Sequence, residues 1–191
     1  MKLKSDFGLA FYIYKMKNNN IRLAQATDIQ SIVKLINTAY RYNLGWTHEH
    51  DIVSGNRINE AQLSELLARP DVELYVLENN DQLVGCIGLT HFPDCFEIGS
   101  FAIDPVRQNS GYGRILLDFA EQYSREKIPF KKLRMSVLNV RIELIAYYER
   151  RGYHQTGKTE SYPLDADVGQ PLVDLNLVIL EKSLEKIYEV I

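Results

Sequence analysis

Two glycines stand close together in the run Gln108-Asn109-Ser110-Gly111-Tyr112-Gly113-Arg114, directly before a segment with helical periodicity. Glycine lets the backbone approach a ligand without interference from a Cβ atom. The start of a helix offers unpaired N–H groups and the positive end of a dipole to an anion. An apolar strand is expected over residues 98–103, so the order strand, turn and helix predicts a phosphate-binding site.

Two common phosphate-binding motifs do not fit this turn. A Rossmann fingerprint requires a further glycine where Leu116 stands, and an acidic residue at the end of the next strand, which here ends in Leu138-Asn139. A Walker loop requires Gly-Lys-Ser/Thr, which is absent. A chain of this length contains about one G-x-G by chance, so a tight turn without a ligand stays the alternative.

Composition favours a single globular domain. The chain has 191 residues, of which 46% are apolar and 25% charged, and its net charge of −3 gives no general case for nucleic acid. No apolar run approaches the roughly 18 residues of a membrane span. Two cysteines, Cys86 and Cys95, are too few for a disulfide framework and are interpreted as packing residues of a cytoplasmic protein. The spacing of His48 and His50 is not that of helical metal ligands, so no metal site is predicted.

Residues 1–20 are expected to form an N-terminal arm or appendage, followed by one domain over residues 21–191. The arm has a weak likeness to a signal peptide but lacks a cleavage site, and Met16 is a second candidate for the start of the chain.

Periodicity predicts a mixed α/β domain with an antiparallel meander in its middle. Thr27-Asp28-Ile29-Gln30 has the form of a capping box, and Asn79-Asn80 is expected to be a tight turn. Gly152 is placed to close the last major helix in the left-handed conformation. The strand over 132–138 must run parallel to its predecessor, because a helix crosses between them. Strands are expected at 21–24, 72–77, 83–89, 96–103, 132–138, 153–159 and 172–180, and helices at 28–42, 59–69, after the glycine turn, and at 139–151.

The order of these elements and two motifs resemble the GNAT (Gcn5-related N-acetyltransferase) superfamily. The first motif is Gln108-x-x-Gly111-x-Gly113, and the second is Asn139 followed by Tyr148-Glu149-Arg150-Arg151-Gly152-Tyr153. The resemblance covers roughly residues 21–182. It implies one GNAT-like domain, with a mostly antiparallel central sheet, helices on both faces, and a parallel, splayed strand pair at the cofactor slot.

The resemblance also implies acetyl-CoA as the acetyl donor, with its pyrophosphate on the backbone N–H groups of the turn and its pantetheine arm paired with the preceding strand. Asn139 would contact the cofactor near the thioester. The residues expected to bind the cofactor are Phe101, Ala102, Ile103, Gln108, Asn109, Ser110, Gly111, Tyr112, Gly113, Arg114 and Asn139.

Acetyl transfer requires a group that accepts the amine's proton and a group that protonates the leaving thiolate. Tyr148 matches the family's acid, whereas the neighbouring Tyr147 fits a packing role. Glu97, early in its strand, resembles the glutamate base of histone-acetylating relatives, and a solvated strand-edge glutamate is an equal alternative. A water chain is the other candidate base. A backbone N–H of Ile103 or Phe101 would hold the developing oxyanion.

Trp46 and Glu49 lie between the first two helices, a connection that borders the acceptor site in the superfamily. An aromatic and acidic lining there would suit a cationic amine. We therefore expect an N-acetyltransferase that acts on a small-molecule or amino-acid-like amine. The alternatives are a protein lysine or N-terminal acetyltransferase and a CoA-binding regulatory module without turnover. The oligomeric state stays open, with a homodimer as one candidate because members of the superfamily are often dimers. No nucleic acid, membrane or metal partner is expected.

Overall fold

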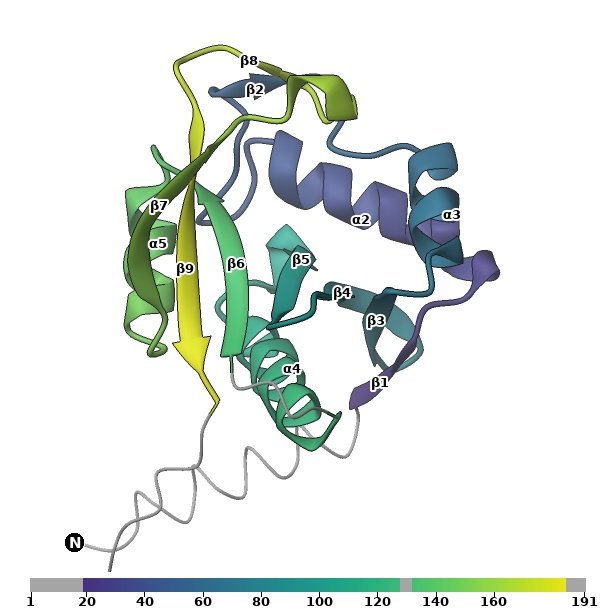
Figure 1. The fold of residues 1–191 in the computed structure, drawn as a ribbon. Coiled ribbons are helices and arrows are strands. Elements are labelled where there is room, and N and C mark those ends of the chain that lie inside the picture. The colour runs from purple at the N-terminus through teal and green to yellow at the C-terminus, as the bar shows by residue number, and fades with distance from the viewer. Residues whose placement is uncertain (1–18, 128–131, 185–191) are drawn as a thin grey trace, which may run out of the picture.

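A seven-stranded sheet forms the centre of the computed structural model, which describes residues 19–127 and 132–184 (Figure 1). The strand order is β1-β3-β4-β5-β6-β9-β7. All neighbouring strands are antiparallel except β5 and β6, which run parallel, as the sequence predicted. The strands are β1 (Asn19–Leu23), β3 (Val72–Asn79), β4 (Gln82–His91), β5 (Phe96–Ile103), β6 (Lys132–Leu138), β7 (His154–Ser161) and β9 (Asn176–Ser183).

Helices cover both faces of this sheet. On one face, α2 (Ile29–Arg41) and α3 (Glu60–Ala68) pack on β3, β4 and β5 through a cluster that includes Ile32, Ile36 and Leu63. On the other face, α4 (Tyr112–Lys127) and α5 (Ile142–Glu149) enclose the larger cluster, which includes Leu116 and Tyr153. Three short 3₁₀ turns complete the described helices: η1 (Ala26–Asp28), η2 (Pro105–Arg107) and η3 (Leu164–Ala166).

Local capping agrees with the sequence at α3 and differs at α2. The side chain of Asn59 accepts the backbone N–H of Gln62 at 2.9 Å, and α3 ends before Pro70, as predicted. The capping box predicted to begin at Thr27 is wrong, because the turn η1 precedes α2. The observed capping box begins at Gln25, and in it the side chain of Asp28 accepts the backbone N–H of Gln25 at 2.7 Å.

Two turns that the sequence predicts are also present in the structure. The turn between β3 and β4 lies one residue later than predicted, because Asn80 and Asp81 adopt positive φ. Gly152 has φ +83° directly after α5, so the predicted left-handed stop is confirmed.

The parallel strands separate soon after they begin. Their pairing ends at Ile98 and Met135, which confirms the predicted splayed pair. On the other side of β5, Ile87 of β4 faces two residues, and Ser100 within this bulge has φ +45°. The hydroxyl of Tyr40 donates to the Phe101 carbonyl at 3.1 Å and ties α2 to the strand where the gap opens.

A second, two-stranded sheet was not predicted. It pairs β2 (Val53–Ser54) with β8 (Gln170–Pro171) near the end of α2 (Figure 1). The side chain of Gln62 also donates to the carbonyls of Ala166 and Asp167 at 3.1 and 3.0 Å. These contacts join the α2–α3 connection to the segment between β7 and β9.

The predicted arm over residues 1–20 lies outside the described residues, except for its last two, Asn19 and Asn20. Those two begin β1, so the domain starts before residue 21. The end of the predicted domain, residues 185–191, also lies outside the described part. Cys86 and Cys95 are both buried free thiols, as their interpretation as packing residues requires.

Candidate active site

A cavity of about 470 Å³ opens where β5 and β6 part, between the glycine turn and α5. Three backbone stretches that were predicted from sequence line it: residues 101–103 of β5, the turn from Gln108, and the start of α4. Of the predicted cofactor residues, the structure brings Phe101, Ala102, Ile103, Gln108, Asn109, Gly111, Tyr112, Gly113 and Arg114 to this cavity. We call it the donor cavity.

The turn presents unpaired N–H groups to the donor cavity. Gly111 has φ +85° and Asn109 has φ +59°, and together they bend the chain into α4. No backbone carbonyl of the described residues accepts from the N–H groups of Asn109, Ser110, Gly111, Gly113 or Arg114. Arg150 and Arg151 add positive charge to the same lining. Such a cradle fits a pyrophosphate.

The side chain of Gln108 holds a neighbouring loop in place. Its Oε1 accepts the backbone N–H of Trp46 at 2.9 Å. The indole of Trp46 therefore lies at the donor cavity, where it packs on Tyr147 with ring centroids 5.8 Å apart. Trp46 does not line the second cavity described below, so its expected place at the acceptor site has no support in this arrangement.

A second cavity of about 360 Å³ lies on the other side of the gap. It is bounded by α2, the loop before β2, the strands β5 and β6, and the segment around Tyr162 and Val168. Both cavities share a wall made of Tyr40, Phe101, Arg141, Leu144 and Tyr148. We call the second space the acceptor cavity.

Tyr148 stands in the shared wall. Only 7% of the residue is exposed, and its hydroxyl has no hydrogen-bond partner among the described residues. Burial raises the pKa of Tyr148 above its ordinary value, and Tyr40 raises it further, whereas Arg141 opposes both. The phenol therefore stays protonated at neutral pH and is available as a proton donor at the boundary between the cavities.

Glu97 lines the acceptor cavity on β5, where it lies beside a cation. Arg134, its register partner on β6, contacts the Glu97 Oε2 atom through Nε at 2.7 Å and through Nη2 at 2.5 Å. The guanidinium of Arg134 also packs over the ring of Phe92 at 4.8 Å. Glu97 is thus a carboxylate paired with Arg134, with about 29% of its side chain exposed.

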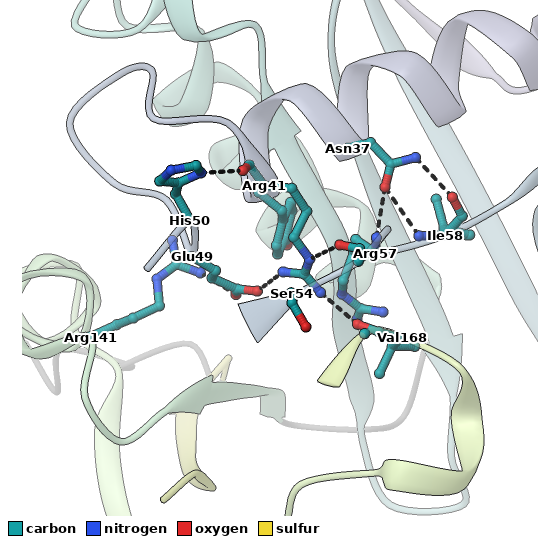
Figure 2. Close-up of polar contacts among 12 residues, drawn as sticks. Asn37, Arg41, Glu49, His50, Ser54, Arg57, Ile58, Arg141 and Val168 are labelled. Carbon is teal, nitrogen blue, oxygen red and sulfur yellow. Dashed lines mark hydrogen bonds and ion pairs between the residues drawn. The ribbon is translucent and has the colours of Figure 1, made fainter. Parts of the chain in front are cut away.

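Glu49 lies between two arginines (Figure 2). Its carboxylate binds Arg41 at the end of α2, and it also accepts from Arg141 Nη1 at 2.8 Å. Arg41 further donates to the carbonyls of Gly55 and Val168, at 3.0 and 2.5 Å. Glu49 lines the acceptor cavity, as expected from the sequence, but its carboxylate is buried and paired with both arginines.

Two predicted cofactor residues are not brought to either cavity. Ser110 lies in the turn but not in the lining, and Asn139 accepts the backbone N–H of Asn176 at 3.1 Å, which fastens β6 to β9. Sequence reasoning did not assign a role in the site to Tyr40, Arg41 or Arg141. Tyr40 has the helical spacing of a core residue, and nothing in the chain marks the two arginines as partners of Glu49.

The sequence of this chain matches a known protein family. The family model described as "Acetyltransferase (GNAT) family" matches residues 29–153, which span α2 to the end of α5 and include the turn and Tyr148. The chain therefore belongs to the GNAT acetyltransferase family. A curated relative, the uncharacterized protein YxbD of Bacillus subtilis, is 35% identical over 78 residues, which are 41% of this chain and 47% of YxbD. The match thus spans about half the length of that relative.

Solved structures share the fold at low sequence identity. The ribosomal-protein-S18-alanine N-acetyltransferase of Escherichia coli has a TM-score of 0.65 at 18% identity, with 91% of this chain and 98% of that chain covered. The spermidine N-acetyltransferase of Vibrio cholerae, in complex with CoA and spermine, has a TM-score of 0.65 at 16% identity, covering 88% and 96%. A GNAT family acetyltransferase of Elizabethkingia anophelis with acetyl-CoA bound has a TM-score of 0.62 at 19% identity, covering 87% and 98%. These likenesses show the fold.

Two further observations concern the described residues alone. None of the helices there is both long and apolar enough to cross a membrane. Within ranges 19–127 and 132–184, no three His, Cys, Asp or Glu side chains are grouped to hold a metal ion.

Proposed function

We propose that this chain transfers the acetyl group of acetyl-CoA directly to the primary amine of a small, amino-acid-like acceptor. The observation that carries the proposal is the shared wall, where Tyr148 and Phe101 border the donor cavity and the acceptor cavity at once. An amine that enters from one side can there reach a thioester held from the other side without a covalent acetyl-enzyme.

In this proposal Glu97 accepts the amine's proton and Tyr148 protonates the leaving sulfur. As the acceptor nitrogen bonds to the acetyl carbon and the carbon–sulfur bond breaks, the amine's proton goes to Glu97, directly or through water. Tyr148 gives its phenolic proton to the departing sulfur, and its raised pKa keeps that proton in place until the thiolate forms. Residues 109–114 bind the pyrophosphate through their N–H groups, and the edge of β5 at Phe101 to Ile103 pairs with the pantetheine arm.

The closed form of the acceptor cavity supports a small acceptor over a protein. Its volume of about 360 Å³ lies in the range of small-molecule sites. The segment between β7 and β9 crosses it and is fixed by the bond from Arg41 to Val168, by Gln62, and by the β2–β8 pairing. A folded protein would have to displace these contacts to present a lysine or an N-terminus.

The test is an acceptor panel with acetyl-CoA and the full chain, read out by thiol release and by the mass of the acetylated product. We expect thiol release with small molecules that carry an α- or β-amino group. Release only with lysine-containing peptides or protein N-termini would favour protein acetylation instead. Tight acetyl-CoA binding without release from any acceptor would identify a CoA-binding module.

A further inference from the structure

The acceptor cavity has more positive than negative charge at the end formed by α2 and α5. Three guanidiniums line this end, from Arg41, Arg57 and Arg141, beside one carboxylate, that of Glu49, which binds Arg41 and Arg141. Arg141 contributes a further unmet donor, because its Nε is buried and has no hydrogen-bond partner within the described residues. The positive charge at this end of the cavity is therefore not fully balanced.

Arg57 is the cation with no assigned partner. No ion pair to its guanidinium occurs among the described residues, and only its backbone N–H is bonded, to Asn37 Oδ1 at 2.7 Å. Its Cζ lies 5.7 Å from the ring centroid of Tyr40, and the Cζ of Arg141 lies 5.8 Å from the same centroid. Both guanidiniums thus lie near the same ring, and the hydroxyl of that ring is bonded to Phe101 at the gap between the cavities.

The other two acidic groups that line the cavity belong to different elements. Glu97 is on β5 and Glu160 is on β7, and both interact with Arg134. An acceptor in this cavity therefore meets these carboxylates on one side and, on the other, the unpaired guanidinium of Arg57 beside that of Arg141. A molecule with an ammonium group and an oxyanion a few bonds apart matches that separation of charge.

We propose that the acceptor carries an anionic group, a carboxylate or a phosphate, which Arg57 and Arg141 bind beside Tyr40 while the amine lies toward Glu97. Arginine suits both oxyanions, because its planar donors match their geometry. The inference rests on the proposed acetyl transfer and narrows its substrate class to amino acids and their phosphate analogues. It excludes polyamines as good acceptors, because a second ammonium would face the arginines.

The test measures kcat/KM by thiol release for matched acceptors, comparing wild type with Arg57→Gln. The pairs are the common L-amino acids and their carboxamides, with aminomethylphosphonate and spermidine as separate arms. A carboxamide also changes the basicity of the amine, so the diagnostic quantity is how the acid-to-amide ratio differs between the two enzymes. We expect Arg57→Gln to lower that ratio about ten- to a hundredfold, the usual effect of losing a hydrogen bond to a charged group.

Controls separate charge recognition from damage to the fold. Arg69→Gln removes an arginine that is paired with Asp71 on the surface, and it should leave the ratio unchanged. Arg57→Lys keeps the positive charge and should restore part of the ratio. Preference for aminomethylphosphonate over the amino acids would identify the anion as a phosphate rather than a carboxylate, and both fit the proposal.

Two outcomes would overturn the inference and can be told apart from failure of the proposed function. Spermidine turned over faster than every amino acid, or an acid-to-amide ratio that Arg57→Gln leaves unchanged, would refute the anion site while acetyl transfer stands. Acetyl-CoA binding with no turnover of any probe would instead refute the proposed function itself.

Discussion

Arg141 and Glu49 form a part-buried ion pair across 92 residues of sequence, with Arg141 Nη1 donating to Glu49 Oε1 at 2.8 Å. The same carboxylate also binds Arg41. Because α2 ends at Arg41 and α5 begins just after Arg141, this one carboxylate holds the ends of two helices that pack on opposite faces of the sheet.

Removing the Glu49 carboxylate should lower the free energy of unfolding. Glu49→Gln would leave two buried guanidiniums without their shared anion, a change of the kind that costs about 3–5 kcal/mol of unfolding free energy. Urea unfolding would measure it. Asp71→Asn, which breaks the exposed pair with Arg69, is the matched control and should leave the free energy of unfolding almost unchanged. Equal effects of the two substitutions would show that the Glu49 pair adds little to stability.

Gly111 should be essential for donor binding. A valine there would have to adopt φ +85°, which is strained for a β-branched residue, and would be expected to reshape the N–H cradle. We expect Gly111→Val to abolish acetyl-CoA binding in calorimetry. Gly157→Val is the control, because Gly157 has a similar φ of +77° and open space around it, so it carries the strain without the cradle. Loss of binding in both variants would point to general destabilisation.

Tyr148→Phe should separate chemistry from binding. Loss of the acid is expected to lower kcat about a hundredfold, with little change in the dissociation constant of acetyl-CoA. Tyr147→Phe makes the same chemical change one residue earlier, at a side chain that lines the donor cavity alone. It should leave kcat close to wild type. A parallel loss of kcat and affinity in Tyr148→Phe would contradict the role of Tyr148 as the acid.

Glu97 should determine the pH profile of kcat/KM if it accepts the amine's proton. Glu97→Gln should then lower the rate and remove the acidic limb of the profile. An acidic limb that this substitution does not alter would assign proton acceptance to another group.

Buried tyrosines should make the fold sensitive to alkali. Burial raises the pKa of Tyr148 and of Tyr153, so each keeps its proton in the folded chain at a pH where the unfolded chain has lost it. The free energy of unfolding is not affected by their titration below about pH 10. Above that pH it declines by about 1.4 kcal/mol per pH unit for each tyrosine. Urea unfolding at a series of alkaline pH values should show a smaller decline for Tyr153→Phe. The exposed Tyr42→Phe should match wild type.

Sequence predicted the parts of this molecule that depend on neighbouring residues. The strand before the turn, Gly111 with its positive φ and the period of α4 are local features, and each is where the pattern placed it. The capping box at Thr27 failed for a local reason as well, since the 3₁₀ turn η1 competes for the same residues.

The acceptor cavity was not predictable in the same way. Its wall is held by bonds between Arg41 and Val168, 127 residues apart, and between Glu49 and Arg141, 92 residues apart. Nothing near Glu49 in sequence shows that two arginines will neutralise it, so a buried ion network was interpreted as an acidic lining. Pairing between distant charges depends on the fold, which a motif does not specify.

The shared wall has a consequence for how relatives of this chain can diverge. About half of the residues that line the donor cavity come from 101–114, whereas the acceptor cavity is assembled from more separate segments, and among the described residues five side chains belong to both. If the proposed function holds, substitutions at Arg57, Glu160 or Val168 change which amine enters without altering the turn that holds the donor. Selection can therefore act on the choice of acceptor and the choice of donor almost independently. The exceptions are the residues of the shared wall, where one substitution changes both cavities: Tyr40, Phe101, Arg141, Leu144 and Tyr148.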